Sequence, residues 1–271
     1  FLIITYLFLA IFIGMISYFI YFQMVKSESV INSSYNSRLD LYAEHVIRGD
    51  ITTADGTVLA KTTVSDDGSE TREYPYGRMF AHVVGYTNNG KGGLESQYNF
   101  NLLRSHSFFL TQIINDLKNK KNIGDTLVTT LDYDVQETAY KALGDRDGAV
   151  VVMEVKTGKI LALVSKPDFD PNTLAERWDD IVSDENSSVL LNRVTSGLYP
   201  PGSTFKIFTT LEYVHENSNY QDYSFDCEGE LNVDGNEIHC YHKAVHGKET
   251  LKDSFANSCN TSFSNIGLSL D

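Results

Sequence analysis

The chain has 271 residues, and its 36 acidic and 22 basic side chains give a formal net charge of −14. A hydrophobic content of 42% and an aromatic content of 12% are typical of a folded chain and exclude a wholly disordered one. The negative charge argues against nucleic-acid binding, which needs a basic face for the phosphates, and by itself it indicates no function.

Residues 1–25 contain no charged side chain, and Lys26 carries the first charge. A helix of this length, rising about 1.5 Å per residue, exceeds a hydrocarbon core of about 30 Å. A cleavable signal peptide usually has a shorter apolar stretch and a small-x-small cleavage site, which the segment Ser27-Glu28-Ser29 imitates poorly. We therefore predict a transmembrane anchor over residues 1–25, with a cleaved leader as the alternative.

A polar, stalk-like segment follows over residues 26–47. Residues 48–60, with the sequence RGDITTADGTVLA, then predict a strand, a turn at Asp55-Gly56 and a return strand. We expect polar, glycine-bearing segments from there to about residue 93.

Residues 130–144 predict one complete helix. Asp132 or Asp134 can cap its N-terminus, apolar residues recur along one face, and Gly144 ends it.

The composition changes at about residue 147, where a second domain is expected to begin. The run GAVVVMEV is typical of a buried strand, and ILALVS reads as the return strand of a hairpin. Between them, Lys156-Thr157-Gly158 is composed as a tight turn requires. Residues 167–172 predict a turn-rich connection, and residues 173–198 are expected to be partly helical.

The segment YPPGSTFKIFTT places Ser203 after two prolines and a glycine, with Lys206 three positions later. The prolines cannot continue a preceding helix, and serine is favoured at a helix N-terminus. The pattern predicts a helix with Ser203, Lys206 and Thr210 on one stripe. It also predicts a buried face made by Ile207, Phe208, Leu211 and Val214.

A serine hydroxyl is a weak nucleophile unless a neighbouring base removes its proton. A lysine one turn along can do so when partial burial lowers its pKa, and a helix N-terminus favours the oxyanion of acyl transfer. The motif alone also fits a capping serine and a solvated lysine.

A second motif, Ser258-Cys259-Asn260, lies between two helix-like stretches in the segment DSFANSCNTSF. With it the chain resembles the class B penicillin-binding proteins. The resemblance covers most of residues 48–271, through RGDITTADGTVLA, HVVGYT, GGLESQYN, GDTLVTTLDYDVQETAYKAL, AVVVMEVKTGKILALVSKPDFDPN, NRVTSGLYPPGSTFKIFTTL and HGKETLKDSFANSCNTSF.

The resemblance implies an α+β protein with an N-terminal transmembrane helix, a β-rich pedestal over residues 26–146, and the first part of a transpeptidase domain over 147–271. It implies that Ser203 is the acylated nucleophile and Lys206 its proton acceptor. Ser258 would relay a proton to the leaving group, and Asn260 would hold the amide backbone of the substrate. Family pedestals usually have Asp-Arg-Asn-Gly where this chain has Thr53-Ala54-Asp55-Gly56, which bears on packing and not on the chemistry.

The same resemblance implies a peptidoglycan D,D-transpeptidase with most of its chain outside the cytoplasm. Its substrate would be a stem peptide ending in D-Ala-D-Ala, β-lactams would trap it, and a membrane glycosyltransferase and other wall-synthesis proteins would be its partners. A β-lactam sensor, a β-lactamase and a non-catalytic wall-assembly protein are the alternatives.

The third family motif, Lys-Thr/Ser-Gly on a strand after Ser-x-Asn, is expected beyond Asp271. Lys156-Thr157-Gly158 spells it at the wrong place and is interpreted as a turn. The chain as given is therefore expected to be truncated at both ends and inactive by itself.

Cysteines and histidines gather late in the chain, at Cys227, His239, Cys240, His242 and His246. Their spacing matches no common zinc module, and the family resemblance explains the segment without metal, so we predict neither a metal nor a cofactor. Cys227 and Cys240 flank a predicted hairpin with an Asp-Gly turn, where a disulfide and two free thiols both remain open. Cys259 is expected to remain unpaired.

Overall fold

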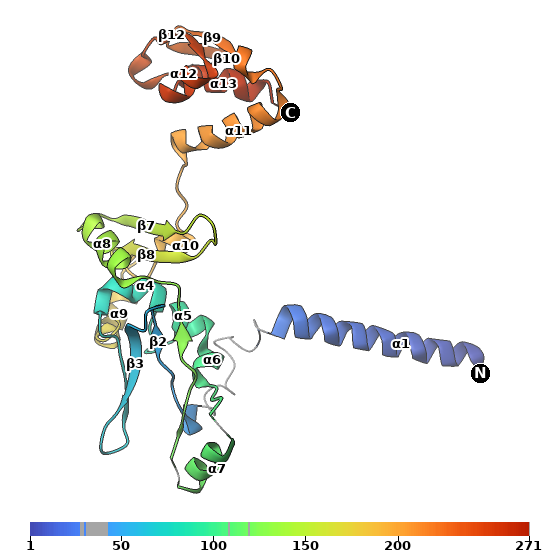
Figure 1. Cartoon of the computed structure of the whole chain (residues 1–271), viewed down its shortest axis with the longest axis vertical. Coiled ribbons are helices and arrows are strands. Elements are labelled where there is room, and N and C mark those ends of the chain that lie inside the picture. Colours follow the sequence, from blue (N-terminus) through green and yellow to red (C-terminus); the bar gives the residue numbers. More distant parts are fainter. Residues whose placement is uncertain (28–29, 31–42, 108, 119, 271) are drawn as a thin grey trace. The chain divides into compact units, whose positions relative to one another are not determined.

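The computed structural model describes residues 1–271 except 28–29, 31–42, 108, 119 and 271 (Figure 1). The chain divides into two compact units, Phe1–Gly197 and Leu198–Asp271, and each has apolar core clusters of its own.

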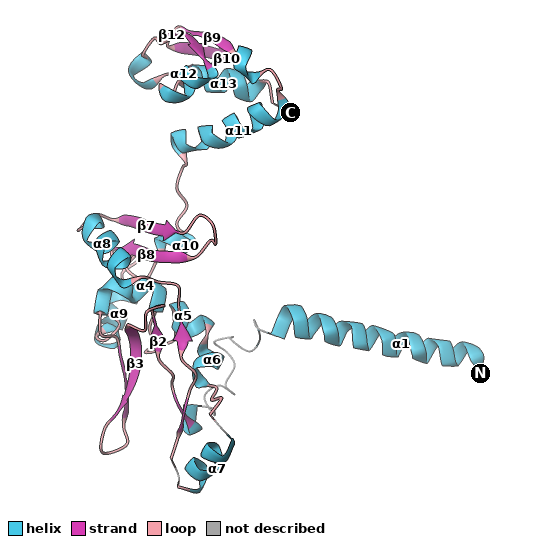
Figure 2. Ribbon diagram, in the orientation of Figure 1, coloured by secondary structure: helices cyan, strands magenta, loops and turns pink. Residues whose placement is uncertain are grey.

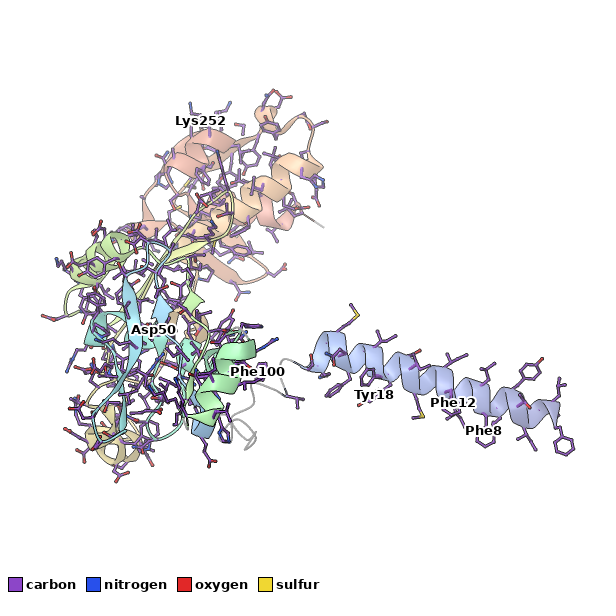
Figure 3. The ribbon with its side chains drawn as sticks, turned by 60° about the horizontal axis from the view of Figure 1, so that its bottom comes forward. Phe8, Phe12, Tyr18, Asp50, Phe100 and Lys252 are labelled. Atoms are coloured by element: carbon purple, nitrogen blue, oxygen red, sulfur yellow. The ribbon has the colours of Figure 1, made fainter. Side chains whose placement is uncertain are left out.

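The apolar N-terminal segment is helical, as predicted. Helix α1 (Leu2–Tyr21) continues into the π-helical turn η1 (Phe22–Lys26), and together they form a 25-residue segment with a mean hydropathy of 2.3. Phe8, Phe12 and Tyr18 project outward from α1 (Figure 3). The segment is long and apolar enough to cross a membrane. Most of the predicted stalk lies outside the described residues.

The first unit combines short strands with short helices (Figure 2). Its strands are β1 (Val46–Ile47), β2 (Ile51–Thr52), β3 (Val58–Val64), β4 (Glu70–Glu73), β5 (Asn122–Ile123), β6 (Leu127–Val128), β7 (Gly148–Met153) and β8 (Ile160–Lys166). Its helices after η1 are η2 (Gly77–Phe80), α4 (Ala81–Val84), α5 (Gly93–Gln97), α6 (Asn99–Leu103), α7 (Phe109–Leu117), α8 (Tyr133–Leu143), η3 (Leu174–Arg177), α9 (Trp178–Ser183) and α10 (Arg193–Ser196). The partial helicity predicted for residues 173–198 is confirmed.

A four-stranded sheet in the order β4-β3-β2-β6 organises the pedestal. The predicted hairpin of residues 48–60 is its centre, with β2 antiparallel to β3 and parallel to β6. Strand β3 runs on to Val64 and pairs with β4, and the polar, glycine-bearing segment that follows also contains η2 and α4. Ile51 on β2, Leu59 on β3 and Leu102 on α6 are fully buried in one apolar core cluster.

A buried carboxylate holds the helical side of the pedestal to its strands. Glu95, on α5, has no exposed side-chain surface and pairs with two guanidinium groups. Arg48 Nε lies 2.5 Å from one carboxylate oxygen and Arg72 Nε lies 2.7 Å from the other. Both arginines are nearly buried, so each charge depends on this carboxylate for compensation.

Helix α8 and the β7–β8 hairpin pack together, which confirms both predictions. Asp132 caps the helix by accepting the Val135 N–H at 3.0 Å, and Gly144 ends it with a φ of 59°. Inside α8, Gln136 is buried and exchanges two hydrogen bonds of 2.8 Å with the main chain of Leu163 on β8. The helix is thereby fixed to the hairpin.

The two strands of the hairpin are antiparallel, and Lys156-Thr157-Gly158 lies in its turn, as predicted. Strand β7 is not buried on both faces, however, so that expectation is wrong. Its residues alternate between partly covered and exposed, because α8 covers one face and Val151 and Met153 project from the other.

The second unit contains the predicted nucleophile and Ser-x-Asn segments. Its elements are η4 (Gly202–Phe205), α11 (Lys206–Glu216), η5 (Tyr220–Asp222), β9 (Ser224–Cys227), β10 (Glu230–Val233), β11 (Asn236–His239), η6 (Tyr241–Lys243), β12 (Gly247–Thr250), α12 (Leu251–Ala256) and α13 (Asn260–Leu268). Strands β10 and β11 form the predicted hairpin, and β9 pairs antiparallel with β12.

Helix α11 packs on α13 through a core that contains Phe263 and Ile266. Of the four residues predicted to make its buried face, only Val214 joins this core. Ile207, Phe208 and Leu211 are 48%, 64% and 62% exposed, so their predicted burial is wrong for the described chain. The apolar spacing predicted the helix correctly, but it could not show what packs against the apolar face of α11.

Candidate active site

The nucleophile segment begins at a turn that only glycine adopts easily. Gly202 has a φ of 56°, in the left-handed region, and it opens the short helix η4 directly after Pro201. Ser203 follows on η4 and is exposed, while Lys206 begins α11 and is partly buried. The turn therefore presents an exposed hydroxyl one helical turn before a lysine.

The Ser-x-Asn segment is a sharp turn between two helices. Helix α12 ends at Ala256, and Cys259 caps α13 by accepting the Ser262 N–H at 3.4 Å. Between them, Ser258 has a φ of 51°, a left-handed conformation that non-glycine residues rarely adopt. This turn directs both Ser258 and Asn260 toward Lys206.

A chain of hydrogen bonds joins the four predicted residues. Lys206 Nζ donates to Asn260 Oδ1 at 2.7 Å, to the Ser258 carbonyl oxygen at 2.6 Å and to Ser258 Oγ at 3.0 Å. Ser258 Oγ donates to Ser203 Oγ at 3.0 Å. Lys206 therefore reaches Ser203 through Ser258, whereas the sequence had suggested a direct contact.

The environment of Lys206 favours its neutral form more than water does. Partial burial lowers the pKa of the Lys206 ammonium below its ordinary value. The amine lies 5.4 Å from the centre of the Phe263 ring, which covers one side of it. A lysine so placed can accept a proton from a neighbouring hydroxyl, as nucleophilic catalysis by serine requires.

Asn260 is held by a contact that sequence reasoning missed. Its Nδ2 donates to the main-chain oxygen of His239 at 2.9 Å, at the end of β11. This bond turns Oδ1 toward Lys206. No side-chain pattern could have revealed it, because the acceptor is a backbone carbonyl 21 residues away.

The structure also brings together three side chains of the metal site that sequence analysis rejected, and it adds Cys259, which was expected to be unpaired. Cys227, Cys240, His246 and Cys259 converge beside the Ser-x-Asn turn, while His239 and His242 do not join them. The spacing along the chain gave no indication of this group because four different elements or loops contribute to it.

An α+β fold with serine, lysine, serine and asparagine joined in this way defines a penicillin-recognising protein. The sequence profile of the penicillin binding protein transpeptidase domain matches residues 148–271, and that of the penicillin binding protein A dimerisation domain matches residues 48–127. The chain belongs to the class B penicillin-binding proteins.

Individual relatives agree with this family. The peptidoglycan D,D-transpeptidase PbpA of Mycolicibacterium smegmatis is 34% identical over 253 residues, which cover 85% of this chain and 50% of that protein. The chain spans about half the length of the curated relatives it matches.

Solved structures agree as well. Penicillin-binding protein A of Mycobacterium tuberculosis, solved as an imipenem acyl-enzyme complex, is 29% identical with a TM-score of 0.76, over 85% of this chain and 57% of that one. The D,D-transpeptidase domain of a peptidoglycan glycosyltransferase from Eggerthella lenta is 33% identical with a TM-score of 0.71, over 83% of this chain and 50% of that one. The predicted penicillin-binding transpeptidase fold is confirmed.

Proposed function

We propose that this protein is a peptidoglycan D,D-transpeptidase in which Ser203 forms an acyl-enzyme. The observation that supports this most directly is the chain of hydrogen bonds from Lys206 through Ser258 to Ser203. The substrate would be a stem peptide ending in D-Ala-D-Ala, and β-lactams would react as its mimics. Relatives named as D,D-transpeptidases, and a neighbour solved as an imipenem acyl-enzyme, support the same reaction.

In the acylation step, Ser203 Oγ attacks the carbonyl carbon of the penultimate D-Ala. Its proton passes to Ser258 Oγ as Ser258 passes its own proton to neutral Lys206. The bond from that carbonyl carbon to the terminal D-Ala nitrogen then breaks, and the proton returns through Ser258 to the leaving amine. Asn260 holds Lys206 in place through a hydrogen bond. It would also hydrogen-bond the peptide backbone of the stem peptide that acylates Ser203.

In the second step, an amine of a neighbouring stem peptide attacks the Ser203 ester. The new amide forms, Ser203 Oγ is released, and the proton of the amine returns to the serine by the same path in reverse. The product is a cross-link between two stems, and no external oxidant or cofactor enters the balance.

The apolar segment Leu2–Lys26 suits the anchor of such an enzyme, because its substrate lies outside the cytoplasmic membrane. We propose that residues 1–25 span the membrane, that residues 26–146 form a stalk and pedestal, and that residues 147–271 belong to the transpeptidase domain. A membrane glycosyltransferase and other wall-synthesis proteins are the proposed partners.

The test is covalent labelling of the full-length protein with a fluorescent penicillin. Wild type is expected to label, Ser203→Ala is expected not to label, and Ser218→Ala, an exposed serine outside the hydrogen-bonded chain, is the matched control. Labelling of Ser203→Ala at the wild-type level would reject the assignment. Release of the label separates the alternatives, since a half-life of hours excludes a β-lactamase.

A further inference from the structure

Three buried cysteines and one histidine converge in the second unit. Cys227 ends β9, Cys240 follows β11, His246 precedes β12, and Cys259 caps α13. Their sulfur atoms and the histidine nitrogen all lie within 4.8 Å of one another. The cysteines are 0%, 3% and 0% exposed, so water cannot solvate the thiols. Four converging ligand atoms indicate a metal site far more strongly than a lone buried cysteine does.

The spacing of the donor atoms matches a tetrahedral zinc site. Cys240 Sγ lies 3.7 Å from both Cys227 Sγ and Cys259 Sγ, and Cys227 Sγ lies 3.3 Å from His246 Nδ1. With Zn–S bonds of about 2.3 Å and Zn–N bonds of about 2.0 Å, tetrahedral angles separate two sulfurs by roughly 3.8 Å and a sulfur from a nitrogen by roughly 3.5 Å. These three separations are close to those that one shared ion would impose, and the other three donor pairs lie within 4.8 Å.

Neighbouring groups donate hydrogen bonds to the sulfurs. Thr261 Oγ1 donates to Cys227 Sγ at 3.2 Å, and the Ser262 N–H donates to Cys259 Sγ at 3.4 Å. Donors of this kind stabilise and orient thiolate ligands around a metal. No carboxylate belongs to the described group, and a set of three sulfurs and one nitrogen suits zinc better than magnesium or calcium.

We propose that Cys227, Cys240, His246 and Cys259 bind one Zn²⁺ ion in a closed structural site. Four protein ligands leave no open position for water, so the ion supplies cross-linking and no chemistry. It would join β9, the segment after β11, the loop before β12 and the start of α13.

The consequence for the active site follows from the position of Cys259. This ligand is the middle residue of the Ser-x-Asn motif, between Ser258 and Asn260, which both hydrogen-bond Lys206. Zinc bound to Cys259 would hold this turn, including the left-handed Ser258, against movement. The zinc site itself does not depend on the proposed function, because metal content is measured without any substrate.

The competing arrangement is a disulfide. Each neighbouring pair of sulfurs is 3.7 Å apart, well beyond the roughly 2.05 Å of a disulfide, so one pair would have to close by more than 1 Å. A disulfide would use two of the three cysteines and leave one thiol. Zinc would leave all three reduced, and this difference can be counted.

The experiment uses the full-length protein, purified in detergent without chelators. Elemental analysis is expected to find about one zinc per chain. Alkylation of the protein unfolded with chelator, followed by peptide mapping, is expected to find Cys227, Cys240 and Cys259 all reactive. After dialysis, the bound zinc of His246→Ala should be at least tenfold lower than that of the wild type. His242→Ala, an exposed histidine on the same segment, should keep it.

Two results would overturn the proposal: wild-type protein without zinc, or only one of Cys227, Cys240 and Cys259 found reactive. If His246→Ala fails to fold, wild-type protein reconstituted with Co²⁺ replaces it as the test. Tetrahedral coordination by three thiolates then predicts intense visible d–d bands and a sulfur-to-cobalt charge-transfer band, and their absence rejects the site. Zinc binding with unlabelled Ser203 would reject the proposed function and leave the metal site standing.

Discussion

The proton path through Ser258 gives the most specific expectation for the reaction. In a Ser258→Ala variant, the link from Lys206 Nζ to Ser203 Oγ disappears, since both 3.0 Å hydrogen bonds use the lost hydroxyl. The lysine itself should stay in place. Its bonds of 2.6 Å to the main-chain oxygen of residue 258 and 2.7 Å to Asn260 remain in the variant.

The size of the effect follows from what is lost. A positioned acid–base group contributes about 10²–10⁴-fold to a rate, which corresponds to about 2.7–5.4 kcal/mol of barrier. Ser258 is exposed, so its loss should change the free energy of unfolding by no more than about 0.5 kcal/mol. We therefore expect a large kinetic loss in a protein of nearly unchanged stability.

The assay is the second-order rate constant of acylation by a fluorescent penicillin, measured on the full-length protein beside its thermal unfolding midpoint. Ser264→Ala is the matched control, because that hydroxyl lies on the adjoining helix α13 and, among the residues that the structure describes, donates only to the Asn260 carbonyl oxygen at 2.9 Å. If Ser258→Ala acylates within about threefold of wild type, Lys206 must reach Ser203 by another path and the relay is wrong.

Two further predictions concern Lys206 and the pedestal. Because burial lowers the pKa of Lys206 and only its neutral form accepts a proton, the acylation rate should rise with pH and level off below the ordinary lysine range. A flat profile, or Lys206→Arg with the wild-type profile, would contradict this. Glu95→Gln should lower the free energy of unfolding of the first unit by about 3–5 kcal/mol, since two buried guanidinium groups lose their counter-charge. Urea unfolding followed by the fluorescence of Trp178, the single tryptophan of the chain, measures this. Glu73→Gln breaks the solvent-exposed ion pair of Lys61 and Glu73 at 3.4 Å and should cost far less. Equal losses in the two variants would refute the argument.

Local signals in the sequence identified the elements around the site correctly. Three features that depend on neighbouring residues alone are as predicted. They are the cap at Asp132, the Asp-Gly hairpin between Cys227 and Cys240, and the turn at Lys156-Thr157-Gly158. The segments of Ser203 and Ser258 were noticed as short motifs, but their interpretation came from the family resemblance. Their catalytic roles stay a prediction until labelling is done.

Long-range facts were not readable from local patterns. Helical periodicity at Ile207, Phe208 and Leu211 predicts an apolar face, but nothing in the period says what covers it, and in the described chain these side chains are exposed. The convergence of Cys227 with His246 and Cys259 could not be predicted from the sequence for the same reason. Strand pairing between β9 and β12 brings Cys227 opposite Gly247, beside His246, and this register is set by the fold and not by the spacing of cysteines.

Backbone strain in the second unit gives a physical reason to place a metal beside the relay. His242 and Lys243, between the ligands Cys240 and His246, have φ values of 52° and 55°, and Ser258, beside Cys259, has 51°. A left-handed non-glycine residue costs roughly 1–2 kcal/mol, and such residues persist where the surroundings fix them. A closed zinc site with ligands on both sides of these turns would supply that constraint, because releasing any one turn would require breaking a metal–ligand bond. Ser258, which links Lys206 to Ser203, would then be kept in its left-handed conformation by the metal ion as well as by the small hydrophobic core of the second unit.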